Sequence, residues 1–187
     1  MGNFTLVTGG ARSGKSRFAE LLATYSGLPV TYIATAQIRD QEMADRVEKH
    51  RQSRPPEWNL IEEPYQIKET LLSLKETPCL ILLDCVTLWL SNLLLASSNP
   101  EEAAILTEVQ EVAQIAAQIT PKVIFVTNEV GEGIVPNNPL ARAYRDLAGR
   151  ANQLLAEAAS AVYFVVAGYP LEIKRQGQQL LDTLRST

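Results

Sequence analysis

The glycine-rich segment GGARSGKS at residues 9–16 restricts the fold of this chain more than any other part of the sequence. It follows a short apolar run at residues 4–8 and precedes a helical pattern that begins at Lys15. Glycines suit such a passage, because they adopt positive φ freely and let the backbone approach a ligand closely. The segment matches the pattern G-x-x-x-x-G-K-[ST], which cradles phosphate groups when it lies between a strand and a helix. The flanking strand and helix favour this interpretation over a chance match within a turn.

The segment predicts a binding site for nucleotide phosphates. Successive backbone N–H groups and the positive end of the helix dipole would face the phosphate oxygens. Lys15 would add a positive charge near the β- and γ-phosphates, and the Ser16 hydroxyl would be a ligand of Mg²⁺. The positions expected to bind the nucleotide here are Gly9, Gly10, Ala11, Arg12, Ser13, Gly14, Lys15 and Ser16.

A metal ion at such a loop needs a carboxylate at the end of a neighbouring strand. The run LILLD at residues 80–84 ends in Asp84. We therefore predict Mg²⁺ as a cofactor, with Ser16 and Asp84 as its protein ligands. Asp84 could equally cap the helix that follows it, and the two roles are compatible. The base-reading motif Asn-Lys-x-Asp of GTPase switches is absent, which argues against that class.

The rest of the chain alternates between apolar runs and helical patterns. This alternation predicts an α/β fold with a mostly parallel sheet covered by helices on both faces, in one domain over residues 1–187. The predicted strands are residues 4–8, 30–34, 80–84, 123–127 and 162–166. The predicted helices are residues 15–25, 40–51, 65–74, 86–95, 100–119 and 140–159. Residues 168–174 indicate a turn and a short antiparallel edge strand, and the polar residues 175–187 indicate a weak or frayed terminal helix.

Composition narrows the choice of partners and of location. The 187 residues carry a formal net charge of −4, which argues against a broad nucleic-acid-binding face. Cys79 and Cys85 would lie about 20 Å apart in an extended run, too far for a disulfide, so we expect reduced thiols. No secretory signal or membrane span is evident, which predicts a cytoplasmic protein.

His50 is the only histidine of the chain. It lies near the end of a helical pattern among basic residues, and a solvated helix face with a cation near its C-terminus is one interpretation. The other is a nucleophile, because neutral imidazole can attack phosphorus and form a phosphoramidate. The local sequence alone leaves both open.

Six further segments accompany the phosphate-binding loop VTGGARSGKS in a fixed order. They are YIATA at 32–36, HRQSRP at 50–55, DCVTLWLSNL at 84–93, TNEVGEGIVP at 127–136, LAR at 140–142 with RDLAG at 145–149, and AGYP at 167–170. Together these segments resemble the bifunctional adenosylcobinamide kinase / adenosylcobinamide-phosphate guanylyltransferase family of cobalamin biosynthesis. The resemblance extends over nearly the whole chain.

The resemblance implies a P-loop NTPase fold similar to the RecA-like class, and a transferase with two reactions. ATP or GTP would phosphorylate adenosylcobinamide, and GMP from GTP would then pass to adenosylcobinamide phosphate through a histidyl-GMP intermediate on His50. It also implies a homo-oligomer, with a homotrimer as the expected state. A monofunctional small-molecule kinase and a non-catalytic GTP-binding module are the alternatives.

The resemblance also implies further nucleotide-binding positions. Beyond the loop they are Ala34, Thr35, Ala36, Arg51, Gln52, Ser53, Arg54, Glu62 and Asp84. A carboxylate such as Glu62 can accept hydrogen bonds from guanine N1–H and N2–H, although it could also be a surface acid. Residues 128–136 follow a predicted strand, and we place them either at the corrinoid site or in a flexible connection.

Overall fold

The computed structural model describes residues 2–37, 41, 45, 48, 55–97 and 101–185. Seven strands of the described chain form one sheet in the order β3-β2-β4-β5-β1-β6-β7. The strands are β1 (Phe4–Thr8), β2 (Val30–Ala34), β3 (Asn59–Glu62), β4 (Leu80–Asp84), β5 (Lys122–Val126), β6 (Ala161–Val166) and β7 (Tyr169–Glu172). The helices are α1 (Lys15–Thr24), α3 (Ile67–Ser73), α4 (Val86–Leu95), α5 (Glu102–Gln118), α6 (Pro139–Ala158) and α7 (Lys174–Arg185).

The first six strands run parallel, and β7 pairs antiparallel with β6. Strand β5 lies between β1 and β4, with Phe4 opposite Val123 and Asp84 opposite Val126. The carboxyl ends of β1, β5 and β4 are therefore neighbours. In an open parallel sheet this edge is where ligands bind.

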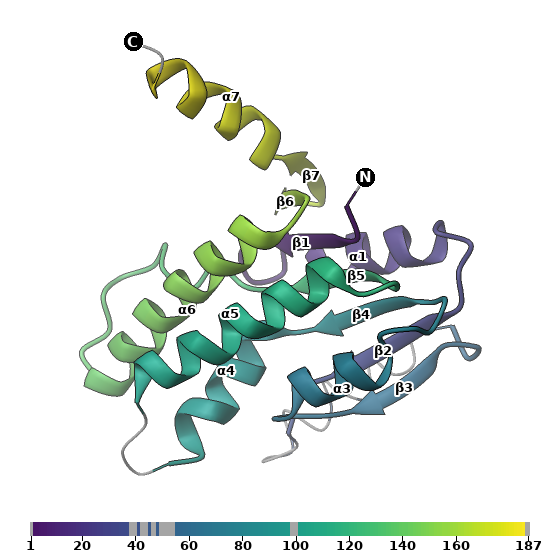
Figure 1. The fold of residues 1–187 in the computed structure, drawn as a ribbon. Helices are drawn as coiled ribbons and strands as arrows, with labels where there is room; N and C mark the ends of the chain where they lie inside the picture. Colours follow the sequence, from purple (N-terminus) through teal and green to yellow (C-terminus); the bar gives the residue numbers. More distant parts are fainter. Residues whose placement is uncertain are drawn as a thin grey trace.

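Helices cover both faces of the sheet (Figure 1). Helices α3, α4, α5 and α6 lie on one face, where Trp89 and Phe125 are fully buried in the larger apolar cluster. Helix α1 packs on the opposite face, where Ala19 and Ala23 belong to a smaller cluster with Val7. Burial on both faces explains why the central strands are continuous apolar runs.

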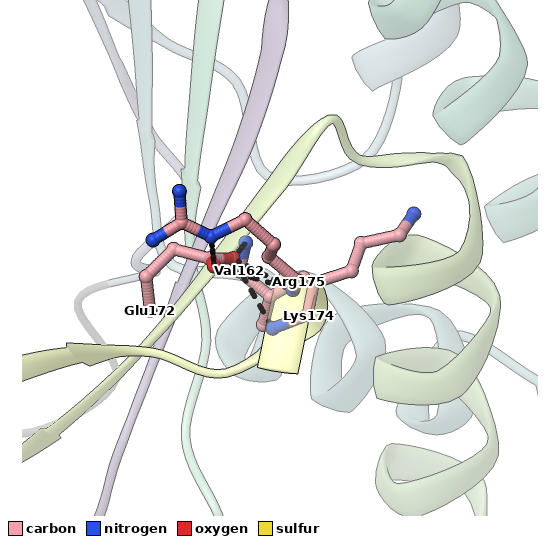
Figure 2. A network of polar contacts seen from close by, with 4 residues as sticks. All are labelled: Val162, Glu172, Lys174 and Arg175. Carbon is pink, nitrogen blue, oxygen red and sulfur yellow. Dashed lines mark hydrogen bonds and ion pairs between the residues drawn. The ribbon is translucent and has the colours of Figure 1, made fainter. Parts of the chain in front are cut away.

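Helix α7 projects away from the body of the molecule and is held at its base (Figure 1). Glu172 accepts hydrogen bonds from the backbone N–H groups of Lys174 and Arg175, at 3.1 and 3.2 Å (Figure 2). The Lys174 ammonium group donates to the carbonyl oxygens of Ala156 and Glu157 at the end of α6, at 2.9 and 2.8 Å. No residue of α7 is buried.

Most predicted elements are confirmed. The strands at 4–8, 30–34 and 80–84 and the helix at 86–95 have the expected bounds, and the last strand is antiparallel at the sheet edge. The strand predicted at 123–127 begins and ends one residue earlier, and the helix predicted at 100–119 spans Glu102–Gln118. The terminal segment, predicted to be weak or frayed, is helical over Lys174–Arg185. The helix predicted at 40–51 lies largely outside the described residues.

The structure also bears on two expectations from composition, those for the cysteines and for membrane-spanning helices. Cys79 and Cys85 are both free thiols. Within the described ranges, no helix has the length and apolar character needed to cross a membrane.

Candidate nucleotide site at the carboxyl edge of the sheet

The loop between β1 and α1 depends on close backbone contacts that two glycines permit. A Cβ atom on Gly9 would lie 2.5 Å from the Val165 carbonyl oxygen, which no side chain tolerates. Gly14 has φ +95°, and a Cβ there would lie 3.2 Å from the Cα atom of Gly168. The Gly168 N–H donates to the Ser13 carbonyl at 2.8 Å, so the turn between β6 and β7 supports the loop from outside.

Helix α1 begins at this loop with its N-terminal N–H groups uncapped. Gly14 is the N-cap residue, no side chain caps the helix, and the first turn contains no acidic residue. The first N–H groups of a helix have no partner within the helix and carry partial positive charge. This end of α1 is therefore suited to bind an anion.

The Lys15 side chain folds back over the loop, and its ammonium group donates to the Gly10 carbonyl at 3.2 Å. Burial lowers the pKa of Lys15, and the nearby Asp84 and Cys85 partly oppose this shift. Lys15 and Asp84 thus lie near enough to interact across the end of β5. A phosphate oxygen of a bound nucleotide could accept the Lys15 hydrogen bond in place of the Gly10 carbonyl oxygen, because both oxygens are acceptors.

The carboxyl ends of β2 and β4 are joined by Thr35. Its hydroxyl donates to the Cys85 carbonyl at 2.8 Å and accepts from the Cys85 N–H at 3.0 Å. Asn92 then donates to the Thr35 carbonyl at 2.8 Å. Burial and the neighbouring Asp84 carboxylate raise the pKa of the Cys85 thiol to about 11, so this thiol stays protonated at neutral pH. The hydrogen bonds of Thr35 hold Cys85, the residue after Asp84, against the end of β2.

The donor set at this edge fits Mg²⁺. Ser16 is in the first turn of α1, and Asp84 ends β4, two strands away from β1. A hydroxyl and a carboxylate are hard oxygen ligands, and Mg²⁺ in phosphate sites takes one or two such ligands together with phosphates and water. Clusters of three or more His, Cys, Asp or Glu side chains that could hold a metal are absent from the described residues.

A polar network follows β5, between the loop and α6. The Thr8 hydroxyl donates to Glu129 Oε1 at 2.6 Å, and Asn152 Nδ2 donates to the same oxygen at 3.1 Å. Thr127 donates to Asn152 Oδ1 at 2.7 Å, and the Glu129 N–H donates to the Gly9 carbonyl at 3.1 Å. The network joins the first glycine of the loop to helix α6.

Sequence reasoning included Glu129 in the segment considered for the corrinoid but gave it no chemical role. One sequence signal could have indicated a role for Glu129. Polar residues follow the strand that became β5, just as Asp84 ends β4, and both strands were predicted to lie in the same parallel sheet. Asn152, in contrast, lies within a helix and has no local sequence signal.

Several buried polar atoms in the described part of the chain lack a partner. They are Ser13 Oγ, Asn128 Oδ1 and Arg145 Nη1. Ser13 belongs to the loop, Asn128 follows β5, and Arg145 is in the N-terminal part of α6. Ser13 and Asn128 follow β1 and β5 at their carboxyl ends, and Arg145 lies on the part of α6 that begins beyond this edge. Buried polar groups normally find partners, so this gathering marks a place where a ligand would supply them.

The remaining predicted positions extend along the same edge. Ala34 ends β2 and pairs with Glu62, which is exposed at the end of β3. Four strand spacings separate β3 from β1, or about 19 Å. A nucleotide that reaches both the loop and Glu62 must therefore lie along the edge. His50, Arg51, Gln52, Ser53 and Arg54 lie outside the described residues, so their roles stay predictions.

Comparison with known proteins identifies the family. A family model for cobinamide kinase / cobinamide phosphate guanyltransferase matches residues 5–173. The chain belongs to this family. The resemblance found in the sequence and the expected transferase class are thereby confirmed.

Relatives of similar length agree with this assignment. The bifunctional adenosylcobalamin biosynthesis protein CobP of Pseudomonas aeruginosa is 46% identical over 169 residues, which cover 90% of this chain and 96% of the relative. The bifunctional adenosylcobalamin biosynthesis protein CobU of Escherichia coli K12 is 46% identical over 179 residues, which cover 90% of this chain and 98% of the relative.

Solved structures support the fold alone. An ATPase from the type III secretion system of pathogenic bacteria aligns with a TM-score of 0.56 and 12% identity, over 92% of this chain and 57% of its own. The P4 protein of bacteriophage phi6, solved with ADP, aligns with a TM-score of 0.51 and 13% identity, over 91% of this chain and 54% of its own. The predicted P-loop, RecA-like α/β fold is confirmed.

Proposed function

We propose that this chain catalyses two consecutive transfers onto one corrinoid substrate. The γ-phosphoryl group of ATP or GTP first passes to the hydroxyl of the aminopropanol arm of adenosylcobinamide. GMP from GTP then passes to the new phosphate, which gives adenosylcobinamide-GDP and pyrophosphate. The observation that carries the proposal is the uncapped N-terminus of α1, with Lys15 near Asp84, in a chain of the cobinamide kinase family.

For phosphoryl transfer, the loop would hold the triphosphate through its backbone N–H groups and through Lys15. Ser16 and Asp84 are the residues that would hold Mg²⁺, which when bound would neutralise charge on the phosphates. Fixed positive groups around the γ-phosphate also favour in-line attack by the acceptor hydroxyl. The rigid contacts of Gly9, Gly14 and Gly168 keep these groups in place before the substrate arrives.

For guanylyl transfer, His50 is the proposed nucleophile. An imidazole nitrogen attacks the α-phosphorus of GTP, the N–P bond forms, and the bond to the pyrophosphate leaving group breaks. A phosphate oxygen of adenosylcobinamide phosphate then displaces the histidine. Arg51 and Arg54 would hold the phosphates, and Glu62 would accept hydrogen bonds from guanine N1–H and N2–H. The assignment of these roles rests on the family resemblance.

The test is retention of label from GTP. Purified protein is incubated with Mg²⁺ and GTP labelled at the α-phosphate, then analysed by denaturing electrophoresis and acid treatment. We expect acid-labile label on the protein, its loss in His50→Ala, and no label from GTP carrying the isotope at the γ-phosphate. Absence of α-label on protein that binds GTP would contradict the covalent mechanism. Phosphorylation of cobinamide that survives in such a protein would then identify a monofunctional kinase.

Self-association through α7 is a further part of the proposal. Leu180, Leu181 and Leu184 are 62%, 49% and 64% exposed, and their spacing places them on one side of the helix. An amphipathic helix of which no residue is buried against the described chain is suited to pack against a second copy, and a homotrimer is the state that the resemblance implies.

Light scattering on the wild type and on the double variant Leu180→Asp/Leu184→Asp tests this part. We expect a defined oligomer that dissociates in the double variant and persists in Gln179→Asp, which alters the opposite side of α7. A monomeric wild type would contradict self-association through α7.

A cytoplasmic location completes the proposal, because ATP and GTP are the substrates of the proposed reactions.

A further inference from the structure

The two proposed reactions differ in what their acceptors must lose. In the kinase step the acceptor is a hydroxyl group, which must give up a proton as its oxygen bonds to phosphorus. In the guanylyl step the acceptor is a phosphate, which is already ionised at neutral pH. A base positioned at the acceptor would therefore accelerate the first reaction and be unnecessary for the second.

The strand order indicates where the γ-phosphate lies. Lys15 belongs to the loop after β1, and Asp84 ends β4. Both must act on the terminal phosphates, Lys15 directly and Asp84 through the metal it would hold. Because β5 lies between β1 and β4, the γ-phosphate is expected above the end of β5. The residues that follow β5 are therefore expected to lie near the incoming hydroxyl.

Glu129 is the carboxylate in this segment. It is partly exposed, and its N–H bond to the Gly9 carbonyl places it beside the first glycine of the loop. Thr8 and Asn152 both donate to Oε1, at 2.6 and 3.1 Å. Within the described chain no donor binds Oε2. One oxygen thus holds the carboxylate in orientation, and the other remains available to accept a proton.

The groups around Glu129 suit a polar acceptor. Asn128 directly precedes Glu129, and its buried Oδ1 has no hydrogen-bond partner among the described residues. Arg145 Nη1 is likewise buried without a hydrogen-bond partner in the described chain, and it lies two helical turns before Asn152, on the same side of α6. Helix α6 runs from the carboxyl edge back to the start of β6, so Arg145 lies farther out beyond the edge than Asn152, by about 10 Å along the helix.

We propose that Glu129 is the catalytic base of the kinase step, an inference that rests on the proposed function. Glu129 Oε2 takes the proton of the acceptor hydroxyl as the hydroxyl oxygen bonds to the γ-phosphorus. The bond between the γ-phosphorus and the bridging β-phosphate oxygen breaks, and the nucleoside diphosphate leaves. The protonated carboxyl group then returns its proton to water.

The test compares the two reactions in Glu129→Gln. Glutamine keeps an oxygen that accepts from Thr8 and Asn152, but it cannot take up a proton. We expect the kcat of adenosylcobinamide phosphorylation to fall by about 10²- to 10⁴-fold, with KM values changed by less than about threefold. Transfer of GMP to preformed adenosylcobinamide phosphate stays at the wild-type rate. Glu76→Gln, which removes an exposed carboxylate between α3 and β4, at the opposite edge of the sheet, leaves both reactions unchanged.

A second variant separates catalysis from packing. Glu129→Asp keeps a carboxylate but shortens it, so a base predicts kinase activity in the order wild type, Asp, Gln. A structural role predicts the reverse order for the two variants, because Gln preserves the size and the hydrogen bonds. Equal loss of both reactions in Glu129→Gln, or no loss of either, overturns the inference. A wild-type protein without either activity would instead overturn the proposed function.

Discussion

Helices α1 and α7 begin in opposite ways. At α7 the Glu172 carboxylate lies against the first N–H groups and accepts from Lys174 and Arg175 (Figure 2). At α1 the N-cap is Gly14 in a left-handed conformation, and no side chain or acidic residue covers the N–H groups. The first N–H groups of a helix have no partner within the helix, so those of α1 are open to a ligand or to water, whereas Glu172 occupies those of α7. The proposed function assigns the start of α1 to a phosphate.

Helix α6, like α7, has its first N–H groups capped by a side chain. The Asn138 side chain accepts from the N–H groups of Leu140 and Ala141, at 2.8 and 3.4 Å. Capping by a side chain stabilises a helix, whereas an uncapped end gives up that stability. The comparison therefore predicts that loss of the charged side chain at the start of α1 affects chemistry more than stability, and that loss of a cap at α6 or α7 does the reverse.

Among variants at these helix starts, the largest effect is expected for Lys15→Met, which removes the cation of the loop. Loss of a charged group that stabilises the transferring phosphoryl should lower kcat for the kinase step by about 10²- to 10³-fold. Stability should not fall, because burial lowers the pKa of Lys15 and the folded state therefore holds the proton less tightly than the unfolded chain. Steady-state kinetics and thermal unfolding at pH 7 measure the two effects.

The sign of the pH dependence offers a second readout for Lys15. A folded-state pKa below the unfolded value means that the free energy of unfolding rises with pH between the two values. The difference in unfolding temperature between wild type and Lys15→Met should therefore shift in favour of the wild type as the pH increases through this alkaline range. A difference that moves in the opposite direction would contradict the role assigned to burial.

Gly14→Ala is expected to have the next largest effect. Its φ of +95° strains any other residue, and the added Cβ would lie 3.2 Å from the Cα atom of Gly168. We expect a loss of about 1–3 kcal/mol in the free energy of unfolding, together with weaker GTP binding. Gly10→Ala is the matched control for stability, since a Cβ at that position would contact nothing within 4 Å. Equal destabilisation by the two variants would refute this account of the loop.

Local sequence carries much of the fold, and the deviations have physical causes. The strand at 4–8 is followed by the glycine-rich loop, and the strand at 80–84 ends in Asp84, so the local sequence marks where each strand ends. The strand predicted at 123–127 instead starts at Lys122, an exposed charged residue that looks like part of a turn. Thr127 was assigned to that strand because it is β-branched, but its hydroxyl bonds to Asn152 in α6. Contacts distant in sequence decide such boundaries.

The same distinction applies to the site and to the C-terminus. The loop and Asp84 were predictable, because the glycine pattern and a carboxylate at the end of an apolar strand are signals contained within a few residues. The orientation of Glu129 was not, because it depends on Thr8 and Asn152, which lie in other elements. The terminal helix was underestimated in part for a similar reason. Its anchor, Lys174, bonds to α6 through a contact distant in sequence, whereas its cap, Glu172, lies two residues before Lys174 and was a local signal that went unused.

A smaller effect is expected for Asn138→Ala at the start of α6. The variant leaves the N–H groups of Leu140 and Ala141 without their side-chain acceptor. The expected loss is about 1 kcal/mol in the free energy of unfolding, measured by denaturant titration. Asn137→Ala, at the adjacent exposed position, should be close to neutral. A loss at position 137 as large as that at position 138 would show that the cap is not the cause.

The smallest effect is expected for Glu172→Gln at the start of α7. Glutamine keeps an oxygen in the place of Oε1, which accepts from the N–H groups of Lys174 and Arg175 at 3.1 and 3.4 Å, so the main loss is the negative charge. The interaction of that charge with the helix dipole contributes roughly 0.3–1 kcal/mol at low ionic strength and is screened by salt. The unfolding difference between wild type and variant should therefore shrink as salt is raised, while kinase kinetics stay unchanged. A difference that salt does not alter would assign the role of Glu172 to hydrogen bonding alone, and the contrast with α1 would then be one of geometry, not of charge.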